Sequence, residues 1–264
     1  MTSRLAAAFE GIRRRGRGGL VTFLTAGDPD AATSAALLEA VAAGGADVLE
    51  VGVPFSDPLA DGPVIQRATE RALSGGTTLR STLDIISRVR RHVAAPIVLF
   101  TYGNPVLRMG PDAFAGSAAA AGVDGVLILD YPVEASAPLR TAIVAAGMDP
   151  IFLISPTTTD SRISSTAKLA GGFLYLISRL GVTGMRDRLP PEVTDLTGRV
   201  RARTDLPLAL GFGISRPEHV AEACRVADAA VVGSALVNVV AAHATETDLC
   251  GRVTEYVKWL KSAL

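Results

Sequence analysis

Short apolar stretches alternate along the whole chain with longer segments in which apolar residues recur at helical spacing. Each apolar stretch is nearly continuous, which is typical of strands buried on both faces. The segments between them are rich in alanine and have the pattern of amphipathic helices. The stretches predict eight strands, at 20–26, 47–53, 96–102, 125–130, 150–155, 172–178, 206–213 and 228–234.

The intervening segments predict the helices that alternate with these strands. A strand and a helix repeated eight times in about 250 residues indicate one closed (β/α)8 TIM barrel spanning residues 1–264, with an open doubly wound sheet as the alternative. No Gly/Ser-rich linker marks a second domain. Extra helices are expected at the N-terminus (2–14), after the second crossover (78–92) and at the C-terminus (247–262). The crossover helices are predicted at 30–43, 62–74, 78–92, 112–121, 134–146, 160–169, 191–203 and 216–225.

Charge and composition narrow the class of partner. Lys plus Arg and Asp plus Glu number 26 each, so the net charge of zero favours neither nucleic acid nor an anionic membrane. The longest apolar stretch, 229–242, is interrupted by polar residues and is too short to cross a bilayer. Cys224 and Cys250 lie far apart and the histidines are scattered, so we expect neither a disulfide framework nor a metal site. A cytoplasmic location fits this pattern.

One predicted strand carries a carboxylate. In the stretch "LEVGVPFSDPLADGP" (49–63), Glu50 stands between Leu49 and Val51. Side chains alternate along a strand, so Glu50 points into the barrel if its two neighbours face the helices. Burial raises the pKa of a carboxyl group toward the working range of a general acid or base. The alternative is a structural carboxylate paired with a buried arginine.

A second carboxylate, Asp61, follows the stiff loop that holds Pro54 and Pro58 and precedes the helix that begins near Pro63. It either caps this helix or folds back to face the same cavity as Glu50. The sequence position alone leaves both readings open.

Three glycine-bearing loops follow the last three strands, and they predict a site for a phosphorylated ligand. They are "SRLGVTGM" (178–185), "GFGIS" (211–215) and "VGSAL" (232–236). Glycines let the backbone approach a ligand, and free N–H groups at the start of a helix attract an anion. Neither "GFGIS" nor "VGSAL" contains a basic residue, so backbone N–H groups are the expected contacts, with Arg179 and Arg216 as the alternatives.

Apolar and aromatic residues near the strand ends predict an apolar part of the same cavity. Tyr175 and Phe212 adjoin the glycine loops, which favours a flat aromatic ligand. Ordinary core packing is the alternative, most of all for Leu127 and Leu153. The candidate wall comprises Phe23, Phe100, Tyr102, Leu127, Leu153, Tyr175 and Phe212.

Over nearly its whole length the chain resembles the tryptophan synthase alpha chain family. The resemblance is carried by "LEVGVPFSDPLADGPVIQRATERAL", "LISRLGVTG", "GFGIS" and "VGSAL". It implies a (β/α)8 barrel that cleaves indole-3-glycerol phosphate to indole and glyceraldehyde 3-phosphate by a retro-aldol reaction. By this resemblance Glu50 matches the general acid/base, Asp61 the indole-facing carboxylate and Tyr175 an active-site tyrosine. Phe23 and Phe212 match walls of the indole pocket, Thr183 lies in the lid, and the phosphate contacts are Gly184, Gly213, Gly233 and Ser234.

The resemblance also implies a partner. The family's alpha chain pairs with a beta chain in an alpha2beta2 assembly. The beta chain holds pyridoxal phosphate, so this chain itself is expected to carry no cofactor and no metal. Two residues depart from the family pattern near the partner's side: Tyr131 stands where leucine is frequent, and Gly103 where a bulkier residue is common. A stand-alone indole-releasing lyase, a related phosphate-binding barrel isomerase and an inactive regulatory subunit are the alternatives.

Overall fold

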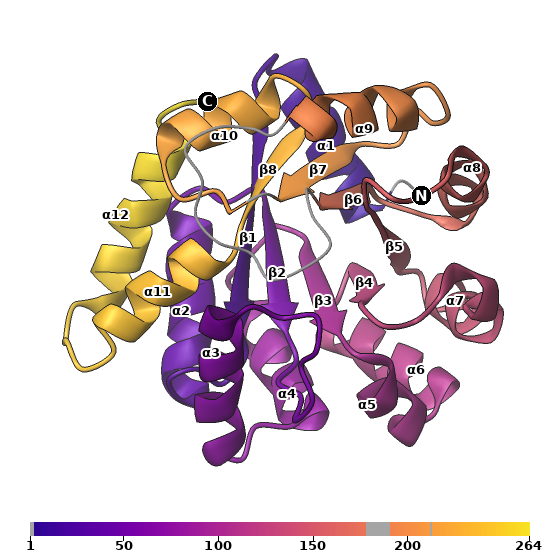
Figure 1. Ribbon diagram of the computed structural model, residues 1–264. Helices are drawn as coiled ribbons and strands as arrows, with labels where there is room; N and C mark the ends of the chain where they lie inside the picture. The colour runs from indigo at the N-terminus through magenta and orange to yellow at the C-terminus, as the bar shows by residue number, and fades with distance from the viewer. Residues whose placement is uncertain (1–2, 178–190, 212) are drawn as a thin grey trace.

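The computed structural model describes residues 3–177, 191–211 and 213–264. Its strands are all parallel and pair in sequence order, and β8 pairs with β1, so the sheet closes into a barrel with helices around it (Figure 1). The predicted (β/α)8 barrel is confirmed, and the open doubly wound sheet is wrong. The strands are β1 (Gly19–Thr25), β2 (Val48–Gly52), β3 (Ile97–Thr101), β4 (Gly125–Ile128), β5 (Asp149–Ile154), β6 (Leu174–Ile177), β7 (Leu208–Gly211) and β8 (Ala229–Val232).

The helices follow the predicted alternation, with two additions. A short helix, α5, begins directly after β3 at "GNP", which has the composition of a loop. The segment after β8, predicted only to start a helix, continues as α11. The helices are α1 (Arg4–Arg14), α2 (Ala31–Ala43), α3 (Pro63–Ser74), α4 (Leu79–Val89), α5 (Gly103–Met109), α6 (Pro111–Ala121), η1 (Val133–Ala135), α7 (Ala137–Ala145), α8 (Asp160–Leu169), α9 (Pro191–Arg201), α10 (Pro217–Cys224), α11 (Ser234–Ala242) and α12 (Leu249–Lys261).

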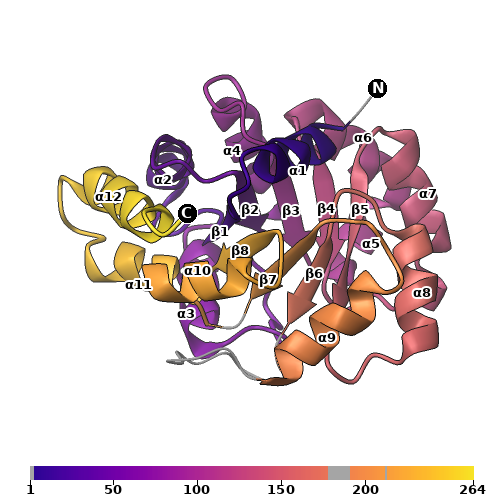
Figure 2. The same cartoon turned by 90° about the horizontal axis from the view of Figure 1, so that it is seen from above.

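Helix α1 closes one end of the barrel. Its side chains Leu5, Phe9 and Ile12 are buried in one cluster with the inward-facing residues of the strands. The helix lies across the strands at their N-terminal end (Figure 2), and the ring of Phe9 packs 5.3 Å from that of Phe173 at the start of β6. Chemistry therefore has to take place at the opposite end, where the strands finish and the βα loops begin.

The strand register fixes which side chains face the inside. Phe23 on β1 is paired with Glu50 on β2, and Glu50 with Val98 on β3. Val48 and Val98 belong to the interior cluster with α1, whereas Leu49 and Val51 belong to the cluster between the sheet and the helices. Glu50 therefore points into the barrel, above its apolar floor, as the alternation of the sequence predicts.

Among the described helices, none is both long enough and apolar enough to cross a membrane.

Candidate functional site

Glu50 is a buried carboxyl group without a hydrogen-bond partner among the residues that the structure describes. Its exposed fraction is 0%, and within the described part of the chain neither carboxyl oxygen has a hydrogen-bond partner. Its lateral neighbours in the sheet, Phe23 and Val98, are apolar. The reading of a structural carboxylate paired with an arginine is therefore wrong for the residues described. Burial raises the pKa of Glu50 from 4.5 to about 8, so the group is mostly protonated at neutral pH and can donate a proton.

Asp61 turns back toward the barrel mouth. Helix α3 is capped by Gly62 without a side-chain hydrogen bond, so the reading of Asp61 as a helix cap is wrong. The Asp61 carboxylate instead accepts a hydrogen bond from the Tyr102 hydroxyl at 2.9 Å. Burial raises its pKa from 3.8 to about 6, and the hydrogen bond from Tyr102 opposes this rise. Near neutral pH, Asp61 is therefore mostly ionised while Glu50 is mostly protonated.

Tyr175 on β6 shares this environment. Burial raises the pKa of its hydroxyl well above 10.0, and the charges of Glu50 and then Asp61 add to the rise. Its ring lies 6.5 Å from that of Phe100. A Cβ atom at Gly211 would lie 3.1 Å from the Tyr175 hydroxyl oxygen, so glycine leaves room for the phenol. The structure thus brings the three predicted catalytic side chains into one electrostatic neighbourhood.

Aromatic rings border this neighbourhood on the side of β1 to β3. Phe23 meets Phe100 edge to face, with 5.2 Å between the ring centroids. The ring of Phe23 has space only because residue 52 is glycine: a Cβ atom there would lie 2.5 Å from its Cζ atom. The two candidate leucines differ, since Leu127 is fully buried in the interior cluster while Leu153 is partly exposed. Packing accounts for Leu127, and Leu153 has a free face for a ligand.

The described part of the predicted phosphate cradle consists of two backbone segments. Gly233 is the N-cap of α11 and makes no side-chain cap, and Ser234 is the first helical residue, so the N–H groups of the first turn lie at the mouth. Gly213, after β7, has φ +85°, a conformation that favours glycine. Phe23 reaches this segment too, because a Cβ atom at Gly233 would lie 3.6 Å from its Cβ. Thr183, Gly184, Phe212 and Arg179 lie outside the described residues.

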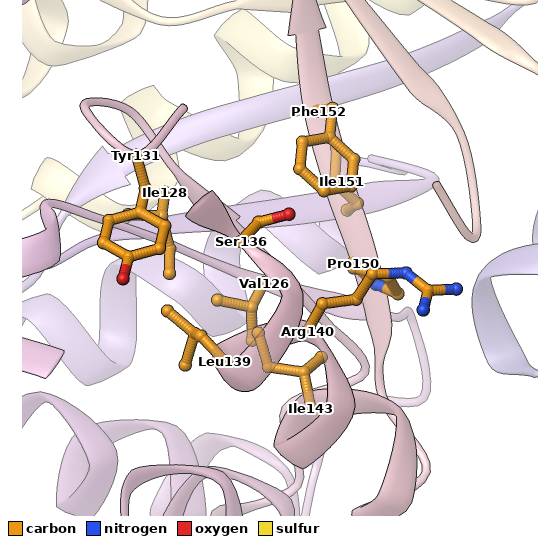
Figure 3. A pocket seen from close by; sticks show the side chains of 10 residues that line it. All are labelled: Val126, Ile128, Tyr131, Ser136, Leu139, Arg140, Ile143, Pro150, Ile151 and Phe152. Atoms are coloured by element: carbon orange, nitrogen blue, oxygen red, sulfur yellow. The ribbon is translucent and has the colours of Figure 1, made fainter. Parts of the chain in front are cut away.

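Two hollows lie near β4 and β5. The smaller, between these strands and α7, has a volume of about 30 Å³ and is lined by side chains such as Tyr131, Leu139 and Phe152 (Figure 3). It has room for a water molecule but not for an indole ring, and its lining includes none of the predicted site residues. The larger, about 320 Å³, lies at the carboxyl ends of the two strands, where Leu153 is part of its wall.

The sequence missed two contacts of the rim. The first is the hydrogen bond from Tyr102 to Asp61. Its only signal in the sequence is that Tyr102 directly follows β3, the strand beside β2, and the path of the loop decides the rest. The second joins the two departures from the family pattern. A Cβ atom at Gly103 would lie 3.2 Å from Cδ2 of Tyr131, so the glycine accommodates the larger ring.

Within residues 3–177, 191–211 and 213–264, no group of three or more His, Cys, Asp or Glu side chains is placed to hold a metal ion.

Comparisons with known proteins agree with this arrangement. Residues 9–264 match the sequence profile described as "Tryptophan synthase alpha chain". Relatives of that name from Solibacter usitatus and Burkholderia pseudomallei are each 48% identical, over 98% and 96% of this chain and 97% and 95% of theirs. A structure of Mycobacterium tuberculosis tryptophan synthase superposes with a TM-score of 0.92 at 37% identity, and tryptophan synthase subunit alpha from Legionella pneumophila with 0.91 at 33%. Both superpositions cover 100% of this chain and 98% of the other. The chain therefore belongs to the tryptophan synthase alpha chain family.

Proposed function

We propose that this chain is a carbon–carbon lyase that cleaves indole-3-glycerol phosphate to indole and glyceraldehyde 3-phosphate in tryptophan biosynthesis. The observation that carries the proposal is the pair of carboxyl groups at the barrel mouth. Burial holds Glu50 protonated at neutral pH, while Asp61, less deeply buried and hydrogen-bonded, is ionised. A retro-aldol cleavage that releases indole requires one group in each state.

Glu50 supplies the proton transfers. The bond between indole C3 and the glycerol chain breaks when C3 has been protonated, because the cationic ring then accepts the bonding electrons. Glu50 donates that proton. The resulting carboxylate accepts the proton of the glycerol hydroxyl on the carbon that was bonded to C3, and this carbon becomes the aldehyde. The proton balance closes, so Glu50 returns to its starting state.

Asp61 stabilises the charge that develops on the ring. Protonation at C3 puts positive charge on the ring nitrogen, and an ionised carboxylate that accepts the ring N–H stabilises this charge. This stabilisation becomes stronger when the rings of Phe23 and Phe100 exclude water from the site. Tyr175 borders the same space, and the uncharged phenol has a hydroxyl that can meet the substrate.

The phosphate is held at the other side of the mouth. The free N–H groups at the start of α11 and the backbone at Gly213 attract a phosphate, and Phe23 lies between this cradle and Glu50. Arg216 is exposed as the N-cap of α10. We assign the main phosphate contacts to backbone N–H groups, together with Gly184.

The partner in the proposal is a tryptophan synthase beta chain in an alpha2beta2 assembly, which would receive the indole. Support comes from the family and from the exposed loop between β2 and α3, where Leu59 is 93% exposed next to Pro58. The two cysteines are free thiols, which fits a reducing compartment, so we place the activity in the cytoplasm.

One assay tests the proposal. The purified chain is incubated with indole-3-glycerol phosphate, with and without a beta chain, and indole and glyceraldehyde 3-phosphate are measured in equal amounts. The Glu50→Gln variant should release almost none, while Glu10→Gln, which alters an exposed carboxylate on α1, should match the wild type. Equal activity with and without the beta chain would favour a stand-alone lyase. No indole under either condition would overturn the proposed function.

A further inference from the structure

The hydroxyl of Tyr102 is a junction between β3 and the loop that carries Asp61. Tyr102 is 4% exposed and follows the last residue of β3. Its oxygen accepts a hydrogen bond from the backbone N–H of Ala60 at 3.1 Å and donates one to the Asp61 carboxylate at 2.9 Å. Its ring packs against that of Phe55, with 5.1 Å between the centroids. The same side chain therefore contacts the loop at its beginning and at its end.

Tyr102 is itself held from the next strand. Asp130, after β4, accepts the backbone N–H of Gly103 at 2.6 Å. Gly103 is the first residue of α5 and Tyr102 is the N-cap of this helix, so the Asp130 carboxylate fixes the peptide that follows Tyr102. A chain of contacts thus runs from β4 through β3 to the catalytic loop after β2.

We propose that Tyr102 is a positioning residue for the cleavage reaction, which holds the Asp61 carboxylate where the indole N–H will meet it and is held in turn by Asp130. The inference rests on the proposed function, since it assigns a task to the carboxylate that this function uses. A carboxylate has two oxygens and several acceptor directions. Tyr102 occupies one oxygen, Oδ2, and leaves the other for the substrate.

The titratable groups around Asp61 come from several elements. The Tyr102 hydroxyl contacts it directly, while Tyr175 on β6 and Glu50 on β2 share the mouth. The charge of Asp130 raises the pKa of Tyr102. Asp57, in the same loop as Asp61, is exposed and hydrogen-bonded to Ser56. Burial, with Asp61 next, raises the pKa of Tyr102, so Tyr102 stays protonated and remains a donor. Of the causes that shift the pKa of Asp61, the bond from Tyr102 is the one that favours the ionised form.

Removal of the Tyr102 hydroxyl should therefore change the pH dependence of the activity, which a loss of packing alone does not do. In Tyr102→Phe the ring remains against Phe55, but Asp61 loses its donor, so its pKa rises above about 6. The low-pH limb of kcat/KM should move upward by about one pH unit. The variant then loses about fivefold at pH 6, and much less at pH 8, where Asp61 is ionised in both proteins.

The matched control is Tyr131→Phe, which removes a hydroxyl from the same rim without touching Asp61. Its profile should follow the wild type, and Asp130→Ala should shift the limb in the same direction as Tyr102→Phe but by less. An unmoved low-pH limb in Tyr102→Phe, with activity lowered equally at all pH values or not at all, would overturn the inference.

A second readout does not depend on turnover. The titration of Asp61 is followed by NMR of the full chain labelled with ¹³C in its aspartate carboxyl groups, in the wild type and in Tyr102→Phe, with Asp61→Asn to assign the signal. A higher midpoint in Tyr102→Phe supports the inference, and an equal midpoint overturns it. If the wild type releases no indole, the proposed function fails, while this titration still decides whether Tyr102 governs the state of Asp61.

Discussion

Carboxylates stand at both ends of the barrel, in opposite surroundings. At the closed end, three aspartates each come immediately before a strand, in the repeated short stretches "ADVLEV", "VDGVLI" and "ADAAVV". Each carboxylate accepts a hydrogen bond from the backbone N–H of the first or second residue of the strand beside it, which would otherwise lack a partner. The pairs are Asp47 with Leu20 (2.9 Å), Asp124 with Ile97 (2.8 Å) and Asp228 with Leu208 (2.8 Å).

Each of these aspartates also has two cations. One cation comes from α1 or the residue that caps it, and the other from a helix of the outer layer or from its C-cap. The pairs are Asp47 with Arg15 and Lys261, Asp124 with Arg4 and Arg90, and Asp228 with Arg13 and Arg201. The closing helix is therefore tied to the strands by charge around its rim and by apolar packing at its centre.

At the open end, the two carboxyl groups of the site have few or no partners among the described residues. Glu50 has no partner in the described residues, and Asp61 has a tyrosine. For Asp228, burial alone would raise the pKa, but hydrogen bonds from Arg13 and Arg201 outweigh it and the pKa is lowered. For Glu50 nothing opposes burial, and the pKa rises to about 8. Partners make a carboxylate a fixed structural anion, and their absence leaves a group that can exchange a proton in the neutral range.

The largest effect that tests this contrast is on activity. Glu50→Gln should lower kcat by about 10³–10⁴-fold or more, because one residue serves two proton transfers. The shape of the side chain is kept, so the circular dichroism spectrum and the binding of a non-cleavable indole–alkyl phosphate should stay close to the wild type. Indole release within tenfold of the wild type would show that the unpartnered carboxylate is not the acid/base group.

The same substitution should change how stability depends on pH. Between pH 4.5, where Glu50 loses its proton in the unfolded chain, and about 8, where it does so in the folded one, the native state binds one proton more. The stability of the wild type therefore falls with rising pH through this window. The stability of Glu50→Gln does not fall in this way. Its free energy of unfolding should therefore rise relative to that of the wild type by at most about 5 kcal/mol between pH 4 and pH 9.

Urea unfolding of both proteins across this range measures the gain, and Glu10→Gln serves as the exposed control. A difference between Glu50→Gln and the wild type that does not change with pH would contradict an uncompensated buried carboxyl group.

The closed end should show the reverse behaviour. Asp228→Ala removes one acceptor from each of two arginines and the acceptor of the Leu208 N–H, which should cost about 3 kcal/mol of unfolding free energy. The pKa of Asp228 is lowered in the folded state, so this stabilisation is present above its ordinary pKa of 3.8 and is lost as the pH falls below it. The kcat of the folded variant should stay within about twofold of the wild type, because the site is at the other end.

The control for Asp228→Ala is Asp205→Ala, since the exposed Asp205 contacts Arg13 through its backbone carbonyl. A large loss of kcat in folded Asp228→Ala would show that the two ends are coupled.

The contrast also explains what the sequence could predict. The strands were predictable because each is a short apolar run, and the alternation around Glu50 was enough to point this side chain inward. That Glu50 has no arginine partner among the described residues was not predictable, because pairing depends on which helix ends reach the interior. Here two arginines of α1, Arg4 and Arg13, pair with aspartates at the closed end of the barrel.

The loops show the opposite case. Asp61 follows a stretch with two prolines, Pro54 and Pro58, and either a helix cap or a return to the barrel satisfies local rules. The choice is made by Tyr102, 41 positions further along the chain, a contact that no local pattern encodes. Helix α5 was missed for a similar reason, because its first peptide is fixed by Asp130 from another strand.

A smaller effect is expected in the phosphate cradle. Gly213→Ala places a Cβ on a residue with φ +85°, which strains the loop and moves its N–H away from the ligand. We expect KM for indole-3-glycerol phosphate to rise about tenfold, equivalent to about 1.4 kcal/mol, with a smaller change in kcat. The comparison is Arg216→Ala. If this variant raises KM as much as Gly213→Ala, the phosphate is bound by the side chain rather than by the backbone.

The smallest effect distinguishes the two cations that pair with one aspartate at the closed end of the barrel, Asp124. Arg4 is 58% exposed and pairs with Asp124 at 3.2 Å, whereas Arg90 is 14% exposed and also donates to the carbonyls of Gly122, Val93 and Ala95. Exposed ion pairs contribute little, so Arg4→Ala should cost about 0.5 kcal/mol or less. Arg90→Ala removes the more buried cation from a nearly buried carboxylate and takes one donor from each of three carbonyls, and should cost about 3 kcal/mol. Urea unfolding at low and high salt measures both. A loss above about 1.5 kcal/mol for Arg4→Ala would mean that α1 is held at its rim as strongly as by its buried face.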